Sequence, residues 1–186
     1  MDKQLLIFDF DGTLIDSVPD LADATNAMLT TLGKETYSLD IIRNWVGNGS
    51  RMLVERALVG KIEVLEDELT VEEADHAEQV FFDAYKNISG SKTVAYPDVD
   101  SGLKKLKAAG YTLALVTNKP IRFVPKILQS FGWQALFSEV LGGDSLPLKK
   151  PDPAPLLHVC KALNVTPKQA VMIGDSRNDI LAGQNA

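Results

Sequence analysis

The sequence lacks the features that mark several large classes of protein. Cys160 is the only cysteine among 186 residues, which excludes an internal disulfide and favours a reducing compartment. The 19 lysines and arginines are outnumbered by 25 acidic residues, and the net charge of −6 argues against a nucleic-acid-binding protein. No apolar run approaches the ~20 residues of a membrane span, and no signal-peptide stretch precedes the first apolar run. We therefore expect a soluble cytoplasmic protein without nucleic-acid or membrane partners.

The chain has enough apolar residues for a buried core, and their spacing changes along its length. Hydrophobic residues make up 45% of the sequence. An apolar run over 5–8 is typical of a buried strand, whereas 16–88 shows helical spacing without a strand pattern. From Tyr96 onward, short apolar runs alternate with helical segments, and the runs lie at 112–116, 139–141 and 170–173. Such alternation is typical of a parallel, doubly wound sheet.

These patterns predict an α/β protein made of two parts. Residues 1–15 and 93–186 would form a Rossmann-like core with a parallel sheet, and residues 16–92 would form an all-helical cap inserted into that core. The length fits a modest domain that carries such an inserted subdomain.

Polar side chains follow the predicted strands at the points where those strands end. Because parallel strands present their carboxyl ends at one edge of a sheet, we expect these side chains to converge. Two of them, Asp9 and Asp11, are carboxylates that would repel each other by about 4 kcal/mol at ~4 Å and an effective dielectric of 20. A hard divalent cation with oxygen ligands is the expected compensation. The convergent residues are Asp9, Asp11, Thr117, Asn118, Lys150, Asp175 and Asp179.

This set of carboxylates, one hydroxyl and one ammonium group suits phosphoryl transfer, in which the enzyme mainly positions groups and stabilises charge. A carboxylate can attack phosphorus once a cation and a lysine have neutralised the phosphate. A second acid can protonate the leaving oxygen and later deprotonate the attacking water.

Four segments resemble the motifs of the haloacid dehalogenase superfamily of phosphohydrolases, in the same order and with the same strand context. They are Asp9-Phe10-Asp11-Gly12-Thr13-Leu14, Thr117-Asn118, Lys150-Pro151 and Gly174-Asp175-Ser176-Arg177-Asn178-Asp179. The resemblance covers essentially the whole chain, and the helical block resembles the small cap of this superfamily. Within it, residues 45–49 and 150–155 are most similar to the phosphoglycolate phosphatases.

The resemblance implies roles for polar residues of the first three of these segments. Asp9 would be the nucleophile that becomes aspartyl-phosphate and would bind Mg²⁺ through its other oxygen. Asp11 would be the general acid and base and would offer its backbone carbonyl to the metal. Thr117 and the backbone of Asn118 would hold a phosphoryl oxygen. Lys150 would pair with Asp9 and the phosphate; it is preferred to Lys149 because it directly precedes proline.

The fourth motif and the cap complete the implied site. Asp175 would ligate the metal directly, and Asp179 would act as a more distant or water-mediated partner, unless it only caps the following helix. The glycine-flanked segment around Gly49 could bind an anion through backbone amides at a helix start, with Arg51 as partner of a substrate carboxylate. The alternative is a flexible turn between helices.

The resemblance predicts a Mg²⁺-dependent phosphatase of a small phosphorylated metabolite, with 2-phosphoglycolate as the favoured substrate. A sugar phosphomutase of the same superfamily, a phospho-receiver domain and a metabolite-binding protein without turnover are the alternatives. The chain ends soon after Asp179, whereas members of the superfamily continue through another strand. We therefore expect the sheet to be truncated at that edge.

Overall fold

A computed structural model describes residues 4–186, which divide into two compact units. One unit comprises the chain up to Asp16 together with Val94–Ala186, and the other comprises Ser17–Thr93. The sequence pattern puts the boundaries after residues 15 and 92, so each observed boundary lies one residue further along the chain.

The first unit is built on a sheet of four parallel strands in the order β5-β4-β1-β6. The strands are β1 (Leu5–Phe8), β4 (Thr112–Val116), β5 (Glu139–Leu141) and β6 (Ala170–Ile173). They coincide with the short, mostly apolar runs of the sequence, and the central strand β1 is buried along its whole length, as expected of a parallel strand covered on both faces. This sheet with its flanking helices confirms the predicted α/β fold class.

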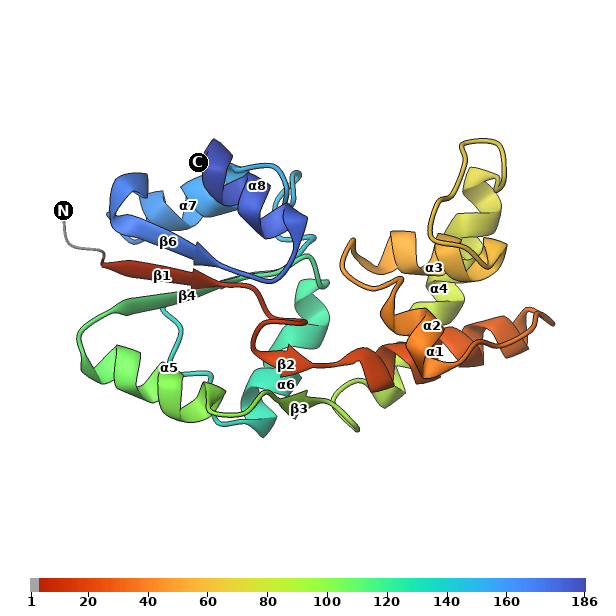
Figure 1. Ribbon diagram of the computed structural model, residues 1–186, viewed down its shortest axis with the longest axis horizontal. Helices are drawn as coiled ribbons and strands as arrows, with labels where there is room; N and C mark the ends of the chain where they lie inside the picture. Colours follow the sequence, from red (N-terminus) through yellow and green to blue (C-terminus); the bar gives the residue numbers. More distant parts are fainter. Residues whose placement is uncertain (1–3) are drawn as a thin grey trace. The chain divides into compact units, whose positions relative to one another are not determined.

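Helices cover both faces of this sheet (Figure 1). On one face lie α5 (Val99–Ala108), the short helix η1 (Ile121–Phe123) and α6 (Val124–Ser130); on the other lie α7 (Ala154–Ala162), η2 (Pro167–Gln169) and α8 (Arg177–Asn185). Side chains of β1 alternate between the two apolar layers, Leu6 and Phe8 in one and Leu5 and Ile7 in the other. The sheet is thereby held rigidly, with its carboxyl edge free for polar residues.

A second, two-stranded antiparallel sheet in the same unit pairs β2 (Ile15–Asp16) with β3 (Val94–Ala95). The prediction that Asp16 opens the helical block is therefore wrong, since Asp16 lies in a strand. A two-residue strand has no measurable period, so its sequence gave no sign of it.

All the regular secondary structure of the second unit is helical, and the unit has buried apolar residues of its own. Its helices are α1 (Val18–Thr31), α2 (Leu39–Arg43), α3 (Ser50–Val59) and α4 (Val71–Ile88). The capping box predicted at the start of α4 is present, since Thr70 and Glu73 exchange side-chain and backbone hydrogen bonds. Within residues 4–186, every helix is too short or too polar to cross a membrane.

A buried carboxylate fastens the end of the helical unit to its first helix. Asp20 of α1 is fully buried and accepts hydrogen bonds from the backbone N–H groups of Gly90, Lys92 and Thr93, at 2.8, 2.7 and 3.1 Å. The Thr93 hydroxyl adds a further hydrogen bond of 2.5 Å. These donors compensate the cost of burying the charge.

Asp20→Ala should lower the free energy of unfolding by about 3–5 kcal/mol, because a fully buried carboxylate and its four hydrogen bonds to Gly90, Lys92 and Thr93 are lost together. Asp23→Ala is the matched control. Asp23 pairs with Lys92, but both side chains are well exposed, so its loss should cost less than about 1 kcal/mol. Urea unfolding of the two variants measures the difference, and equal losses would contradict the role given to Asp20.

Candidate active site

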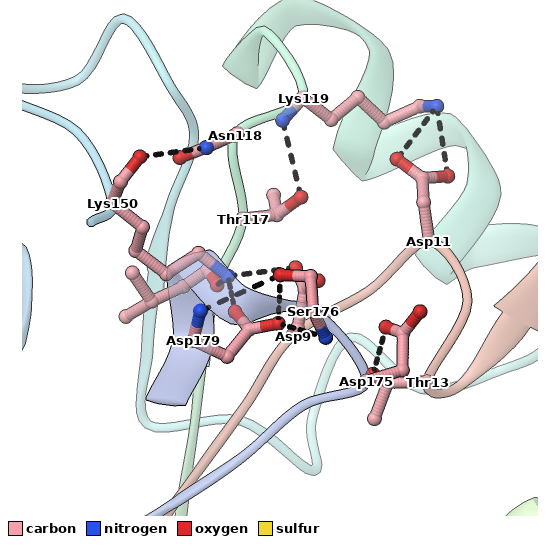
Figure 2. A network of polar contacts seen from close by, with 11 residues as sticks. Asp9, Asp11, Thr13, Thr117, Asn118, Lys119, Lys150, Asp175, Ser176 and Asp179 are labelled. Carbon is pink, nitrogen blue, oxygen red and sulfur yellow. Dashed lines mark hydrogen bonds and ion pairs between the residues drawn. The ribbon is translucent and has the colours of Figure 1, made fainter. Parts of the chain in front are cut away.

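The polar residues that follow β1, β4 and β6 meet at the carboxyl edge of the parallel sheet (Figure 2). The sheet ladder continues into this edge, since the Asp9 N–H donates to the Ile173 carbonyl at 2.9 Å and the Thr117 N–H donates to the Leu141 carbonyl at 3.0 Å. The positions of the first residues of the site are therefore set by the same hydrogen bonds that pair the strands.

Three of the predicted carboxylates gather at one point of this edge. One carboxylate oxygen each from Asp9, Asp175 and Asp179 lies within 4.8 Å of the others. Asp175 also accepts a hydrogen bond of 2.8 Å from the hydroxyl of Thr13. Three converging oxygens of this kind suit a hard divalent cation such as Mg²⁺, which takes oxygen ligands and keeps several waters. The donor set fits the predicted metal.

Lys150 reaches the same cluster from the loop before α7. Its ammonium group, almost completely buried, lies 2.9 Å from Asp9, 2.6 Å from Asp179 and 2.7 Å from the Val116 carbonyl. Its neighbour Lys149 is exposed. One buried ammonium group thus compensates part of the negative charge of two buried carboxylates, and Lys150 rather than Lys149 occupies the site.

Burial raises the pKa of the Asp9 carboxyl from 3.8 to about 6. The nearby Lys150 opposes this shift, and the negative charge of Asp179 adds to it. The folded chain therefore holds a proton on Asp9 more tightly than the unfolded chain does.

This raised pKa predicts that stability falls as the pH rises through the window from about 4 to about 6, because the folded chain must give up a proton that it binds more tightly. A shift of this size corresponds to about 3 kcal/mol above the window. Asp9→Asn removes the titrating group. Urea unfolding in EDTA should therefore show the variant gaining stability relative to the original chain across that window. A pH-independent difference would contradict the prediction.

Asp179 caps the helix that follows it, which is one of the two roles that the sequence left open, and it also contacts Lys150. One of its oxygens accepts hydrogen bonds from the backbone N–H and hydroxyl of Ser176, at 3.0 and 2.5 Å, which completes a capping box at the start of α8. The other oxygen accepts from Lys150. The same side chain thus fixes the helix and the buried lysine.

Thr117 and Asn118 lie beside Lys150 at the end of β4. The buried Thr117 hydroxyl accepts a hydrogen bond of 3.1 Å from the Lys119 N–H, which leaves its own hydrogen available to donate to another acceptor. The Asn118 amide donates to the Lys150 carbonyl at 2.9 Å and so fixes the loop that carries this lysine. The side chain of Asn118 therefore has a structural task that sequence reasoning missed.

Asp11 does not join the cluster of Asp9, Asp175 and Asp179. Its carboxylate points to Lys119, whose ammonium group lies 3.0 and 3.2 Å from its two oxygens (Figure 2). Sequence reasoning gave Lys119 no role. Its position two residues after Thr117, at the same strand end, was the available signal.

The turn after β1 is also shaped by its contact with Asp175. Gly12 has φ +87°, and a Cβ atom there would lie 2.4 Å from a carboxylate oxygen of Asp175. Gly110 has a similar φ of +92° but open space around it. Only the first glycine is therefore required by close packing as well as by its backbone conformation.

Gly12→Ala should reduce kcat/KM by about 100-fold, because displacing Asp175 by an ångström or so disturbs the metal site. The control Gly110→Ala carries the same backbone strain, about 1–2 kcal/mol, and should retain activity. Both variants should be compared by thermal unfolding and by the Mg²⁺ concentration that gives half-maximal rate. Equal activity losses would show that backbone strain alone is responsible.

The two predicted cap residues lie at the start of α3. Gly49 precedes the helix with φ 90°, a conformation that favours glycine. Arg51 makes ion pairs with Glu55 at 2.6 Å, with Asp75, and with Glu78 at 3.7 Å. The hydrogen bond to Asp75 is the main cause that raises the pKa of the Arg51 guanidinium. A substrate carboxylate would therefore compete with protein carboxylates for this side chain.

Comparisons with known proteins agree with the geometry of the site. A model of the family described as haloacid dehalogenase-like hydrolase matches residues 6–186. The chain is 84% identical over its whole length to a phosphoglycolate phosphatase of Psychrobacter arcticus, and 48% identical to one of Colwellia psychrerythraea; it spans 81% of each of these relatives.

The fold matches solved structures equally well. A protein described as a predicted phosphoglycolate phosphatase from Haemophilus somnus superposes with a TM-score of 0.90 at 41% identity, over all of this chain and 83% of that one. These matches confirm the resemblance carried by the four motifs. The chain belongs to the haloacid dehalogenase-like hydrolase family.

Proposed function

We propose that this protein is a Mg²⁺-dependent phosphatase that hydrolyses 2-phosphoglycolate to glycolate and inorganic phosphate. The observation that carries the proposal is the buried ammonium group of Lys150, 2.9 Å from Asp9 and beside the carboxylate cluster. A carboxylate held beside a cation at the carboxyl edge of a parallel sheet suits nucleophilic attack on phosphorus. The choice of substrate is supported by the names of the relatives from Psychrobacter arcticus and Colwellia psychrerythraea.

Asp9 and Asp175 would hold the metal, together with the backbone carbonyl of Asp11. Asp179 would act on the metal indirectly, through a bound water or through a residue that ligates the metal. When bound, Mg²⁺ neutralises charge on the phosphoryl oxygens and so lowers the barrier to attack by an anion. Lys150 and the Thr117 hydroxyl add fixed positive charge and a hydrogen-bond donor, and the backbone of Asn118 assists them.

In the first step, a carboxylate oxygen of Asp9 bonds to phosphorus while the phosphorus–oxygen ester bond breaks. The electron pair of that bond leaves with the substrate oxygen, which takes a proton from the carboxyl group of Asp11. The products are aspartyl-phosphate at Asp9 and free glycolate. Lys150 stabilises the negative charge on the phosphoryl group throughout this step.

In the second step, water attacks the phosphorus of the aspartyl-phosphate. Asp11, now a carboxylate, takes the proton of the attacking water, and the bond between phosphorus and the Asp9 oxygen breaks. Inorganic phosphate leaves, Asp9 is again a carboxylate and Asp11 is again protonated. The two aspartates thus return to their starting states after one turnover.

The residues at the start of α3 are proposed to bind the carboxylate end of 2-phosphoglycolate. The backbone amides after Gly49 face an anion favourably at a helix start, and Arg51 would pair with the substrate carboxylate in exchange for one of its protein partners. Arg51→Ala should raise KM for 2-phosphoglycolate more than KM for a phosphate ester without a carboxylate.

A cytoplasmic place of action fits a chain with one cysteine.

Phosphate release from 2-phosphoglycolate, with Mg²⁺ and then with EDTA, tests the proposal. Mg²⁺-dependent release that is faster than from ethyl phosphate or glucose 6-phosphate is the expected result. Transfer of phosphate between positions of a sugar, without release of free phosphate, would instead identify a phosphomutase. Failure to hydrolyse any phosphate monoester with Mg²⁺ present would overturn the assignment as a phosphatase.

A further inference from the structure

Lys119 is a buried cation that the reaction described above does not use. Its side chain is only 3% exposed, and its ammonium group contacts both oxygens of Asp11, at 3.0 and 3.2 Å. An ammonium group is rarely buried without an anionic partner, because taking a charge out of water costs several kcal/mol. The close contact with two oxygens of one carboxylate supplies such a partner.

The backbone of Lys119 is fixed by the loops that form the site. Its N–H donates to the Thr117 hydroxyl at 3.1 Å, and its carbonyl accepts from the Gly143 N–H at 2.8 Å. A Cβ atom on Gly143 would lie 2.3 Å from the Asn118 carbonyl oxygen, so the two loops pack without space between them. The direction in which Lys119 leaves the backbone is therefore determined by the residues around Thr117.

The contact with Lys119 sets the direction of the Asp11 side chain. In Figure 2 the Asp11 carboxylate extends toward Lys119, whereas Asp175 stands beside Thr13. Asp11 is also absent from the group of carboxylates, Asp9, Asp175 and Asp179, whose oxygens lie within 4.8 Å of one another. The ion pair with Lys119 favours the orientation of the Asp11 carboxylate that the structure shows.

We propose that Lys119 is a positioning residue for Asp11, holding its carboxyl group where it gives a proton to the leaving oxygen. This inference rests on the proposed function, because it assigns a task within the same reaction. Proton transfer requires the donor within hydrogen-bond reach of the leaving oxygen, so a small rotation of Asp11 is enough to slow it. In this scheme Lys119 acts on the reaction through the side-chain carboxylate of Asp11.

The dependence of the rate on the leaving group separates this role from a general structural one. An alkoxide is a poor leaving group that needs a proton as its bond to phosphorus breaks, whereas p-nitrophenolate leaves readily without one. The ratio kcat/KM reports the steps up to the formation of aspartyl-phosphate, which include this proton transfer. Loss of Lys119 should therefore affect benzyl phosphate much more than p-nitrophenyl phosphate.

The test compares Lys119→Met with the original chain on these two esters in the presence of Mg²⁺. We expect kcat/KM for benzyl phosphate to fall about 100-fold, and the loss for p-nitrophenyl phosphate to be at least about tenfold smaller. Lys119→Arg should recover part of the loss, because a guanidinium also binds both oxygens of a carboxylate. Equal losses on the two esters would overturn the proposal, and Lys119→Gln repeats the test if the methionine variant does not fold.

A double-mutant cycle with Asp11→Asn tests whether Lys119 acts through Asp11. If it does, adding Lys119→Met to Asp11→Asn should cause little further loss on benzyl phosphate. If the double variant instead loses the product of the two single-variant losses in kcat/KM, Lys119 does not act through Asp11. Lys149→Met is the control, because that lysine is exposed and its loss should leave the rates on both esters unchanged. Since neither ester is phosphoglycolate, a different natural substrate would leave this result unaffected, whereas no hydrolysis of either ester would count against the proposed function itself.

Discussion

Asp9→Asn should abolish phosphate release, with kcat lowered by about 10⁴-fold or more, because an amide cannot form aspartyl-phosphate. The substitution keeps the size of a buried side chain and a possible contact with Lys150, so the fold should persist. Release of phosphate from 2-phosphoglycolate in the presence of Mg²⁺ is the direct measurement. The large effect is expected because Asp9 forms the covalent bond to phosphorus in the proposed reaction.

Rapid acid quenching during turnover provides the complementary evidence. The original chain should gain a phosphoryl group that peptide mass spectrometry places at Asp9, and Asp9→Asn should not gain one. Asp16→Asn is a suitable control, because Asp16 is a nearby aspartate that ends the short strand β2 and lies outside the cluster of Asp9, Asp175 and Asp179. Phosphorylation of another residue, or an Asp9→Asn enzyme that retains a tenth of its activity, would contradict the assignment of the nucleophile.

Lys150→Met should both inactivate the protein and destabilise it. The substitution removes the cation between Asp9 and Asp179, which lie 2.9 and 2.6 Å from it, and leaves two buried carboxylates facing each other. Removing one partner of a buried ion pair costs about 3–5 kcal/mol. Urea unfolding at neutral pH should show a loss in this range, and kcat/KM should fall because the phosphoryl group loses a fixed positive charge.

Lys149→Met is the matched control for this prediction, since it removes an exposed lysine one residue away. It should change stability by less than about 0.5 kcal/mol. The stability lost in Lys150→Met should recover partly as the pH is lowered, because protonation of the buried Asp9 carboxylate relieves its repulsion with Asp179. If Lys149→Met destabilises the chain as much as Lys150→Met, the ion pairs of Lys150 do not account for the effect.

The elements that could be predicted from sequence are those whose cause is local. The four strands of the parallel sheet coincide with short, mostly apolar runs, and the ends of three of them mark where Asp9, Thr117 and Asp175 lie. The capping box of α4 was visible because Thr70 and Glu73 are only three residues apart. In each case the physical cause lies within a few neighbouring residues.

Features that depend on residues far apart in the chain could not be predicted. The partner of Asp11 is Lys119, more than a hundred residues away, and only the three-dimensional structure brings the two together. The hydrogen bonds of Asp20 to the segment that ends the helical unit are of the same kind. Arg51 is a further example. Its position in the sequence suggested a contact with the substrate, whereas the structure shows an ion pair with Asp75 that the sequence did not indicate.

The pairing of β2 with β3 has a consequence for how this protein can change. Ile15 lies opposite Ala95 and Asp16 opposite Val94, so the polypeptide leaves the first unit and re-enters it at adjacent points. An insertion with neighbouring ends behaves as a cassette, since a longer, shorter or different module can replace it while the flanking backbone stays in register. Exchange of Ser17–Thr93 can therefore change the helical unit, which is proposed to bind the carboxylate end of the substrate, without new demands on the residues at the edge of the parallel sheet.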